Sequence, residues 1–585
     1  MARRALILYE STLTERELRL GRILDFFGVP WNFVLTSDLR IMRMRDKDCV
    51  VFGCLPAVAA TLRQDRRAVR QMSPLGKFYA YLNDDKNACV QALDVLFGAG
   101  SFALKQAAMC SLSVSSELRD LTGPMSGLEL RVPMQEGDVL LAGATADENA
   151  EIAAIISAGA SPVFFRSQFL DMEIFICTSS RMVDINLPVE HGYYDVKEHF
   201  FPVVPLLLFL RFAFPEAAWR PQEIGACVIV DDPLLQPHYG FCDFARLHDL
   251  MQQYNFTTNI SFIPWNWRRT SLSEAEFFNS RSDRFSVSIH GCDHSAGEFG
   301  ATSSGVLVSR ARLAQTRMLR HEQRTGVHHE PVMVFPQGVF SSNCPDVLHH
   351  SGFLAAVNTE IAPVDSAGVR TLVRDVWDVA IRSYGGFPIF TRRYTFHGIE
   401  NFAFDLLLGK PCLIVTHHDS FRDGGAGLAA MIEKLGERNP DLRWRSLGEV
   451  VRRACRRRKI GANAEQVEMY GAELRLANPS ERALEVSIRK RELEPSLVAG
   501  VLAGGKPTDW TAEGDGVVFS TTVPARGETF FQIAYRSVPE PVQGSRPLRY
   551  EVTVAVRRIL SEIRDNYWSK VSRSDLISAK PKVHA

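Results

Sequence analysis

The sequence lacks the features that mark several broad classes of protein. Lys and Arg together number 67 and Asp and Glu also number 67, so no global charge favours a nucleic acid. No stretch approaches the ~20 apolar residues of a membrane-spanning helix. The nearest, Phe200 to Leu210, contains two prolines, and we expect a buried strand or connector there. We therefore predict neither a nucleic-acid partner nor a transmembrane segment.

The sequence also lacks a disulfide framework and a recognisable leader. Its 11 cysteines are scattered singly, without a C-x-x-C pair, and several lie in apolar runs. Near the N-terminus two arginines precede a short apolar run, and acids follow at Glu10 and Glu15, which is unlike a secretory signal. Reduced thiols and the missing leader predict a cytoplasmic location. An extracytoplasmic location stays open.

The pattern of apolar runs predicts two successive α/β units. Residues 1–200 alternate short strands with helical patterns, including a helix expected over Glu148–Ala158. This alternation is typical of a flavodoxin-like or Rossmann-like domain. Residues 220–455 repeat it at the size of a barrel, with strands expected at 227–230, 258–263, 285–289, 332–335, 354–357 and 413–416. No glycine-rich nucleotide motif follows any strand of the first unit.

The remainder of the chain has a different character. The basic run from Arg452 to Lys459 is expected to be a solvated helix end and linker. Residues 463–538 alternate with a period of two between turn signals, which predicts a small β-sandwich. A linker rich in Pro and Gly then leads to a C-terminal helix and tail over 548–585, with the amphipathic pattern clearest from Val554 to Val571.

Acids and histidines follow two of the expected barrel strands. Asp231 and Asp232 follow the strand at 227–230, and His290 and His294 follow the strand at 285–289. Strand ends of an α/β barrel converge at one mouth, where such folds place their chemistry. Two neutral imidazoles and one carboxylate hold a divalent metal and leave positions for water and a substrate oxygen. Asp232 supplies the carboxylate ligand, so the acid beside it is free to act as a general base.

Further candidates complete such a site. His417 and His418 end the strand at 413–416 and are candidates for the acid that protonates a leaving group. Trp265 and Tyr239 have aromatic faces that could stack on sugar rings, and core packing is the alternative for both.

These motifs resemble those of the polysaccharide deacetylase superfamily, the NodB-homology fold of carbohydrate esterase family four. Val230-Asp231-Asp232 matches the first motif, His290 and His294 match the second, and Val415-Thr416-His417 matches the fifth. The resemblance implies a distorted (β/α) barrel. It implies that Asp231 is the base, that His417 is the acid with His418 as a competitor, and that the metal ligands are Asp232, His290 and His294. The implied metal is Zn²⁺, with Co²⁺ or Ni²⁺ as alternatives.

The sequence departs from the family pattern at several positions. Pro233 replaces the usual glycine after the two acids, and the third motif has no arginine before Pro336-Gln337. Arg374 and Arg382 are the candidates to replace that arginine. A backbone N–H near Gln337 is expected to stabilise an oxyanion. Asp378 echoes the fourth motif, and we include it with Gln337 among the expected substrate contacts.

The expected function is removal of acetyl groups from an N-acetylated amino-sugar polysaccharide or related glycan, with a polysaccharide or oligosaccharide as the binding partner. Divergent family members with extra N- and C-terminal domains act on exopolysaccharides, and this architecture resembles theirs. Two alternatives remain open. One is another metal-dependent amidase or glycosidase on the same scaffold, and the other is a non-catalytic carbohydrate-binding protein, because the third-motif arginine is missing.

Overall fold

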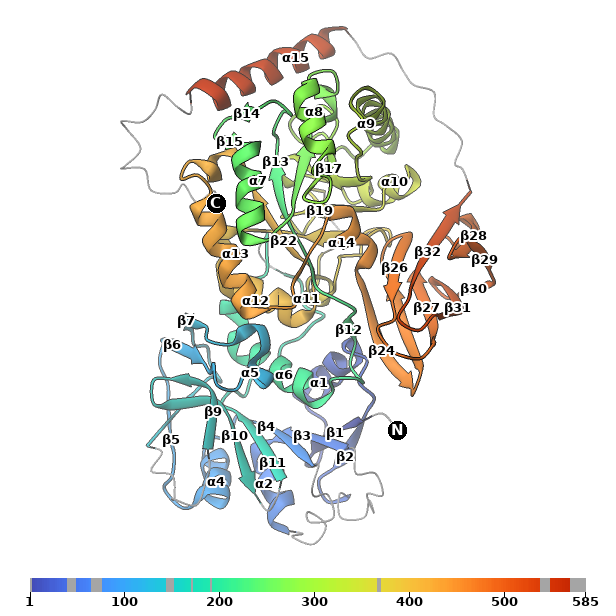
Figure 1. Cartoon of the computed structure of the whole chain (residues 1–585). Coiled ribbons are helices and arrows are strands. Elements are labelled where there is room, and N and C mark those ends of the chain that lie inside the picture. The colour runs from blue at the N-terminus through green and yellow to red at the C-terminus, as the bar shows by residue number, and fades with distance from the viewer. Residues whose placement is uncertain are drawn as a thin grey trace.

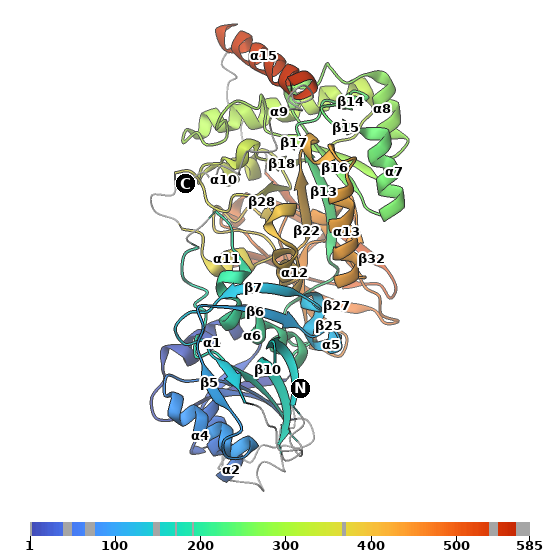
Figure 2. The same cartoon turned by 90° about the vertical axis from the view of Figure 1, so that its left-hand side faces the viewer.

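The computed structural model describes residues 3–38, 49–64, 76–143, 152–169, 172–189, 192–365, 370–536 and 548–568. An α/β domain, a barrel and a pair of β-sheets follow one another along the chain, and the C-terminal helix lies at the far end of the barrel (Figures 1 and 2). The expected linker before residue 548 and the tail beyond 568 lie outside the described residues. No helix in the described part of the chain has both the length and the apolar character needed to cross a bilayer.

The N-terminal domain is built on a sheet with the strand order β2-β1-β3-β4-β11-β10-β9-β6-β7. Strands β1 to β4 pair in parallel with one another and with β11, as expected of an α/β domain, whereas every pairing from β11 through β10, β9, β6 and β7 is antiparallel. The strands are β1 (Arg4–Tyr9), β2 (Trp31–Leu35), β3 (Cys49–Cys54), β4 (Lys77–Tyr81), β6 (Met109–Val114), β7 (Glu129–Pro133), β9 (Ile152–Ala158), β10 (Ser161–Phe169) and β11 (Met172–Cys177), with the pair β5 (Ala103–Lys105) and β8 (Leu140–Ala142) beside them. The helices are α1 (Glu15–Phe26), α2 (Leu55–Gln64), α4 (Lys86–Phe97) and α5 (Arg119–Thr122).

Two expectations for this region are wrong. Ile152–Ala158 forms the strand β9 and not part of a helix, because the apolar run pairs with β10 and β6; residues 148–151 lie outside the described residues. The apolar run expected as a strand forms α6 (Phe200–Ala213), which has Pro205 inside it. All but two of its residues are buried, so a helix that is apolar on every side satisfies its backbone while it packs on all faces.

The barrel sheet has the strand order β20-β19-β18-β17-β16-β13-β22-β21, all parallel. The six expected strands are present, and the sheet consists of β13 (Gly225–Asp231), β16 (Thr258–Phe262), β17 (Phe285–His290), β18 (Val332–Val334), β19 (Ala355–Asn358), β20 (Ile389–Thr391), β21 (Arg393–Tyr394) and β22 (Cys412–Thr416), with β23 (Arg443–Trp444) added to β13. Strands β20 and β21 lie at opposite ends of this order, yet only Arg392 separates them in the sequence. The two ends of the sheet therefore meet at Arg392, and the barrel is nearly closed.

Helices surround this sheet on the outside (Figure 1). They are α7 (Phe244–Tyr254), α8 (Leu272–Asn279), α9 (Ser304–Thr325), α10 (Cys344–His350), α11 (Val373–Trp377), α12 (Ile399–Leu408), α13 (Ala426–Arg438) and α14 (Leu447–Arg453). The alternation of strands and helices confirms the predicted (β/α) barrel and the α/β class.

Two antiparallel-rich sheets follow the barrel and share one apolar core. The first has the order β12-β24-β25-β27-β31-β30 and the second β26-β32-β28-β29. Their strands are β12 (Arg220–Pro221), β24 (Cys455–Gly461), β25 (Ala464–Met469), β26 (Glu473–Ala477), β27 (Leu484–Arg491), β28 (Val498–Ala503), β29 (Lys506–Thr508), β30 (Trp510–Glu513), β31 (Gly516–Val523) and β32 (Glu528–Tyr535). The last described elements are α15 (Leu548–Ile563) and a π-helical turn at Arg564–Trp568.

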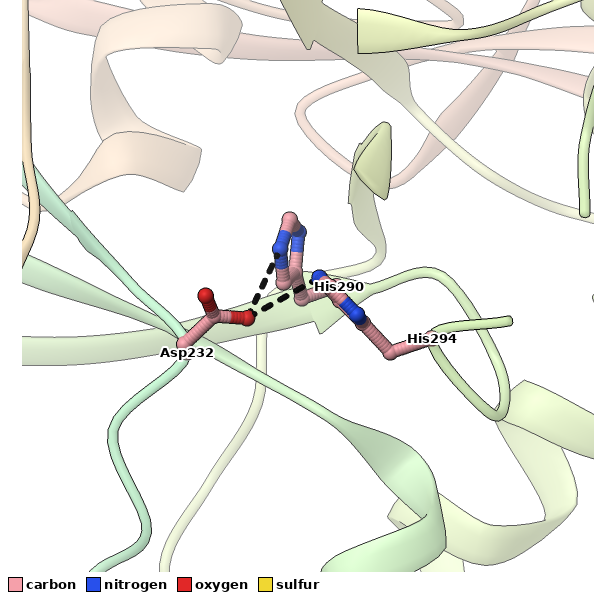
Figure 3. A group of neighbouring side chains, drawn as sticks. All are labelled: Asp232, His290 and His294. Carbon is pink, nitrogen blue, oxygen red and sulfur yellow. Dashed lines mark ion pairs between the residues drawn. The ribbon is translucent and has the colours of Figure 1, made fainter. Parts of the chain in front are cut away.

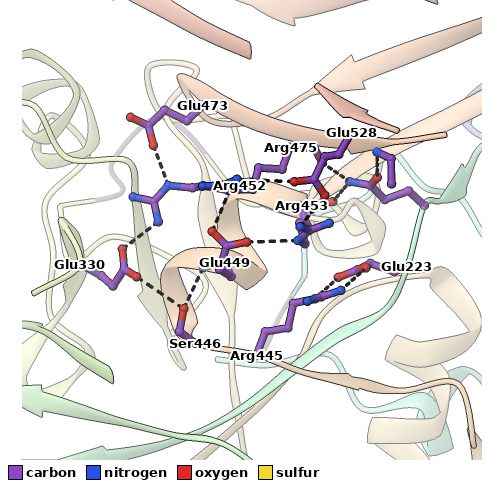
Figure 4. A network of polar contacts seen from close by, with 12 residues as sticks. Glu223, Glu330, Arg445, Ser446, Glu449, Arg452, Arg453, Glu473, Arg475 and Glu528 are labelled. Atoms are coloured by element: carbon purple, nitrogen blue, oxygen red, sulfur yellow. Dashed lines mark hydrogen bonds and ion pairs between the residues drawn. The ribbon is translucent and has the colours of Figure 1, made fainter. Parts of the chain in front are cut away.

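The basic run expected to be solvated lies instead at the junction between the barrel and these sheets (Figure 4). Arg452 lies 2.9 Å from Glu330 and 2.7 Å from Glu473, and Arg453 lies 2.6 Å from Glu528. The run ends α14 and then continues as β24, so its arginines face acids of the barrel and of neighbouring strands. The positive charge of this basic run is therefore paired with glutamates from other parts of the chain.

Candidate active site

Asp232, His290 and His294 converge at the carboxyl ends of β13 and β17, two barrel strands separated by β16 (Figure 3). Asp232 Oδ1 lies 3.4 Å from His290 Nε2 and 3.0 Å from His294 Nε2. One ligand atom from each of the three residues lies within 4.8 Å of the others. Asp232 and His294 both have positive φ, of 79° and 55°. Strained backbone of this kind is found at functional sites, where the surrounding structure holds it in place.

The proton positions in this cluster fit a cation. His290 Nδ1 lies 3.0 Å from the carbonyl oxygen of Val334. A carbonyl only accepts, so Nδ1 carries the proton and the Nε2 lone pair faces Asp232. Asp232 Oδ1 is buried and accepts no hydrogen bond. Burial would raise the pKa of Asp232, and positive charge on His294 and His290 would hold it well below its ordinary value; a bound cation would supply that charge where the imidazoles are neutral. A charged carboxylate and a lone pair that face each other are the donor set of a divalent metal.

The loop that carries His294 is held by one carboxylate. Glu298 accepts hydrogen bonds from the backbone N–H groups of Cys292, Asp293 and His294, at 2.8, 3.0 and 3.2 Å. Gly291 begins this loop with φ of 64°, and a Cβ there would lie 1.9 Å from Glu298 Oε1, so only glycine fits. Glu298 thus fixes the position of His294, a candidate ligand, through the backbone of its loop.

Asp231, beside the cluster, is paired with Arg392. The guanidinium donates to both carboxylate oxygens, Nη1 to Oδ1 at 2.8 Å and Nη2 to Oδ2 at 2.7 Å, and both side chains are about 3% exposed. Burial would raise the pKa of Asp231, but Arg392, His290 and His417 together lower it below its ordinary value. Asp231 is therefore charged at neutral pH. The arginine that replaces the missing one is Arg392, and the expectation of Arg374 or Arg382 is wrong for this position.

The two adjacent histidines have different surroundings. His417 Nε2 lies 3.9 Å from Asp231 Oδ2, and its side chain is 40% exposed. Its ring stacks on Tyr394, whose ring stacks in turn on Phe396 with the ring centroids 4.8 Å apart. His418 is buried and points to Asp565 of the C-terminal π-helical turn, with Nε2 3.7 Å from its carboxylate. Only His417 is open to a substrate beside Asp231.

The other expected site residues are more dispersed. Trp265 is half-buried, and its backbone N–H donates to Cys292 of the loop before His294. Tyr239 is buried, and its hydroxyl donates to Asp565. Gln337 is exposed with φ of 58°, and its side chain accepts from Gly297 at 3.4 Å. Asp378 lies among charged side chains that join the barrel to the C-terminal sheets, where it accepts from Arg382 at 2.9 Å. The substrate contacts of all four remain predictions.

Sequence reasoning missed several residues that shape the site. Arg392 lies 161 residues from Asp231 in the sequence, and no motif links the two. Glu298 follows the second motif closely, but its role depends on the loop conformation. Tyr394 and the 77% exposed Phe396 form an aromatic surface next to His417. The one sequence signal for these residues is the pair of arginines followed by an aromatic residue, Arg392-Arg393-Tyr394.

The comparisons with known proteins agree with this geometry at the level of fold. No family model matches the sequence, and no curated protein matches it. Among solved structures, Agd3, described as a novel carbohydrate deacetylase, aligns with a TM-score of 0.50 and 9% identity over 91% of this chain and 99% of that one. A family 4 carbohydrate esterase from Streptomyces lividans aligns with a TM-score of 0.24 and 12% identity over 38% of this chain and 92% of that one. A family 4 acetyl xylan esterase from Clostridium thermocellum aligns with a TM-score of 0.24 and 13% identity over 39% of this chain and 89% of that one. Along nearly its whole length, the chain therefore has a fold similar to that of Agd3, the protein described as a carbohydrate deacetylase.

Proposed function

We propose that this protein is a metal-dependent hydrolase that removes acetyl groups from an N-acetylated amino-sugar polysaccharide or a related glycan. The observation that carries the proposal is one arrangement of side chains. The cluster of Asp232, His290 and His294 lies beside a charged Asp231, and His417 lies 3.9 Å from that same acid. Fold alone does not assign a reaction, so the proposal depends on this arrangement.

The ligand set supports Zn²⁺, with Co²⁺ or Ni²⁺ as alternatives. Two imidazoles and one carboxylate are a common ligand set of catalytic zinc, and they leave coordination positions open. A divalent ion held there would polarise an acetyl carbonyl oxygen and lower the pKa of a nearby water. Asp232, His290 and His294 would hold it, and the hydrogen bond from His290 to Val334 keeps one ring oriented.

Asp231 is suited to act as the general base. Arg392 fixes its orientation and keeps it charged, and each carboxylate oxygen retains a lone pair that can accept a proton from an attacking water. The missing third-motif arginine had favoured a non-catalytic binding protein. Arg392 supplies such a partner from the link between β20 and β21, which removes that reason for the alternative.

His417 is suited to act as the acid that protonates the departing amine. Its ring is exposed beside Asp231, whereas the ring of His418 is buried against Tyr239 and Asp565. A backbone N–H near Gln337 is proposed to stabilise the oxyanion. Phe396 offers an exposed aromatic face, backed by the ring of Tyr394, on which a pyranose ring could stack.

The proposal is tested by metal analysis combined with acetate release. The purified protein is expected to contain close to one zinc per chain and to release acetate from at least one of a panel of N-acetylated glycans. Asp231→Asn should retain the metal and lose acetate release, whereas Asp419→Asn, which changes a 58% exposed acid next to the histidines, should retain both.

The outcomes separate the alternatives. Full activity in Asp231→Asn would contradict the assignment of the base. Hydrolysis of simple amides or glycosides in place of acetylated glycans would point to a different hydrolase. Glycan binding without metal and without acetate release would identify a non-catalytic carbohydrate-binding protein.

A further inference from the structure

The C-terminal helix α15 and the turn that follows it lie across one side of the barrel mouth. Glu562 pairs with Arg269 at 2.6 Å, and Asp565 accepts from the Tyr239 hydroxyl at 2.9 Å. Asn566 accepts from the backbone N–H of Gly240 at 2.7 Å. These contacts are polar, and the helix also buries Val554 and Arg558. In both views α15 forms the end of the molecule opposite the N-terminal domain (Figures 1 and 2).

The opposite face of α15 is an exposed apolar stripe. In the described part of the chain, 18 large hydrophobic side chains are exposed, and six of these belong to this one helix of 16 residues. Their exposed fractions run from 41% to 81%. The stripe consists of Leu548, Val552, Val556, Ile559, Leu560 and Ile563.

The spacing places all six side chains on one face. Successive members are four, four, three, one and three residues apart, which is the repeat of a single helix surface. A helix of a globular protein normally turns such a face toward the core. Here Val554 and Arg558 are the buried positions, and the apolar face is turned to solvent. A contiguous exposed apolar surface of this kind marks an interaction site.

Positive charge accompanies the stripe. At about 100° per residue, Arg549 lies within the angular range of the stripe at its N-terminal end, and Arg557 lies about 60° beyond the edge that Leu560 marks. Residues 548–585 contain eight Lys and Arg against four Asp and Glu, whereas the rest of the chain contains 59 against 63. The balanced total charge therefore conceals a basic C-terminal segment.

We propose that α15 docks the protein on an anionic membrane surface, with the apolar stripe in the interface and the arginines at the lipid headgroups. An aliphatic face, basic residues beside it and a low mean hydropathy are the features of a helix that lies in the membrane plane. A second copy of the chain is the weaker candidate. The helix is only about 24 Å long. One face of so short a helix is small beside the roughly 800 Å² that a stable protein interface needs from each partner. The docking is independent of the proposed enzymatic function.

Co-sedimentation of the full chain with vesicles tests the proposal. The protein should sediment with vesicles of phosphatidylcholine containing about 30 mol % phosphatidylglycerol, and much less with phosphatidylcholine alone. Val556→Glu combined with Leu560→Glu should lower the partition coefficient at least ~10-fold. Arg549→Gln combined with Arg557→Gln should lower it severalfold and weaken its dependence on salt.

A matched control and a second measurement keep the test decisive. Ile460→Glu with Leu493→Glu changes two exposed apolar side chains of the C-terminal sheets and should leave binding unchanged. Circular dichroism should show that every variant is folded. Absence of binding to anionic vesicles, or equal binding by the stripe variant, would overturn the proposal. So would a dimer in sedimentation velocity that the stripe variant converts to a monomer, because the occupant of the stripe would then be a second copy.

Discussion

Substitution of Arg392 by Gln should shift the pH dependence of the enzyme. In the folded protein Arg392 and its neighbours lower the pKa of Asp231 below its ordinary value, against the opposing effect of burial. This pair therefore contributes stability at every pH above the unfolded pKa of about 3.9, and the contribution is lost as the pH falls through the lowered folded pKa. Without the guanidinium, only His290 and His417 oppose the effect of burial, and the pKa of Asp231 should rise.

The size of the effect follows from the geometry. A buried carboxylate that loses its only bidentate partner costs about 3–5 kcal/mol if it stays charged. Protonation limits that cost, because one unit of pKa shift corresponds to about 1.4 kcal/mol. An opposite charge at hydrogen-bond distance lowers an Asp pKa by about 1–3 units. The acidic limb of kcat/KM in Arg392→Gln should therefore move about 2 units or more toward higher pH.

The assay is acetate release measured across pH, with metal content determined for each variant. Arg392→Lys keeps the charge but not the two parallel hydrogen bonds, so its acidic limb should lie between the other two. Arg393→Gln is the matched control, because the neighbouring Arg393 forms a buried bidentate pair with Asp405. It should lose stability and keep the wild-type acidic limb. A folded, metal-loaded Arg392→Gln with the wild-type limb would refute the reasoning.

The remaining predictions concern the metal ligands, their support and the acid. Added Zn²⁺ at about 1,000 times its Kd should stabilise the wild type by about 4 kcal/mol in thermal unfolding, and a chelator should reverse this. Asp232→Asn should show no such stabilisation by Zn²⁺. Equal stabilisation of that variant would exclude Asp232 as a ligand. Glu298→Gln should weaken metal affinity about 10–100-fold in competition with a chromophoric chelator, since it frees the loop of His294; unchanged affinity would contradict that role. His417→Gln should lower kcat about 10²–10⁴-fold with the metal retained, and His418→Gln much less. The reverse order would assign the acid to His418.

The elements that the sequence predicted well are those whose pattern is local. The six predicted barrel strands are apolar or alternating runs followed by polar residues, and the metal cluster lies at the ends of two of them. What the sequence did not predict depends on distant pairing. Strands β20 and β21 are only three and two residues long, too short to show a period, and their place is set by β19 and β22. Arg392 lies between them, so its pairing with Asp231 was hidden for the same reason.

Two further differences have related causes. The run of α6 is apolar at every position, and periodicity cannot separate a strand from a helix that is buried on all sides. The basic run ending in β24 looks solvated in the sequence because its glutamate partners come from the barrel and from other strands. In α15, the amphipathic pattern predicted a helix correctly, but only the structure shows that the apolar face is turned away from the protein.

The candidate metal ligands and the residues around the proposed base come from different parts of the barrel sequence. All three candidate ligands lie between residues 232 and 294, at the ends of strands that come early in the barrel sequence. The partner of the base and the acid come later, at Arg392 and His417, where the sheet meets itself. An incomplete or opened barrel could keep its ligands together and yet leave Asp231 buried without a counter-charge, and therefore neutral. Closure of the barrel sheet at Arg392 would thus be required for catalysis: a barrel that is not closed would still bind metal but could not catalyse the reaction.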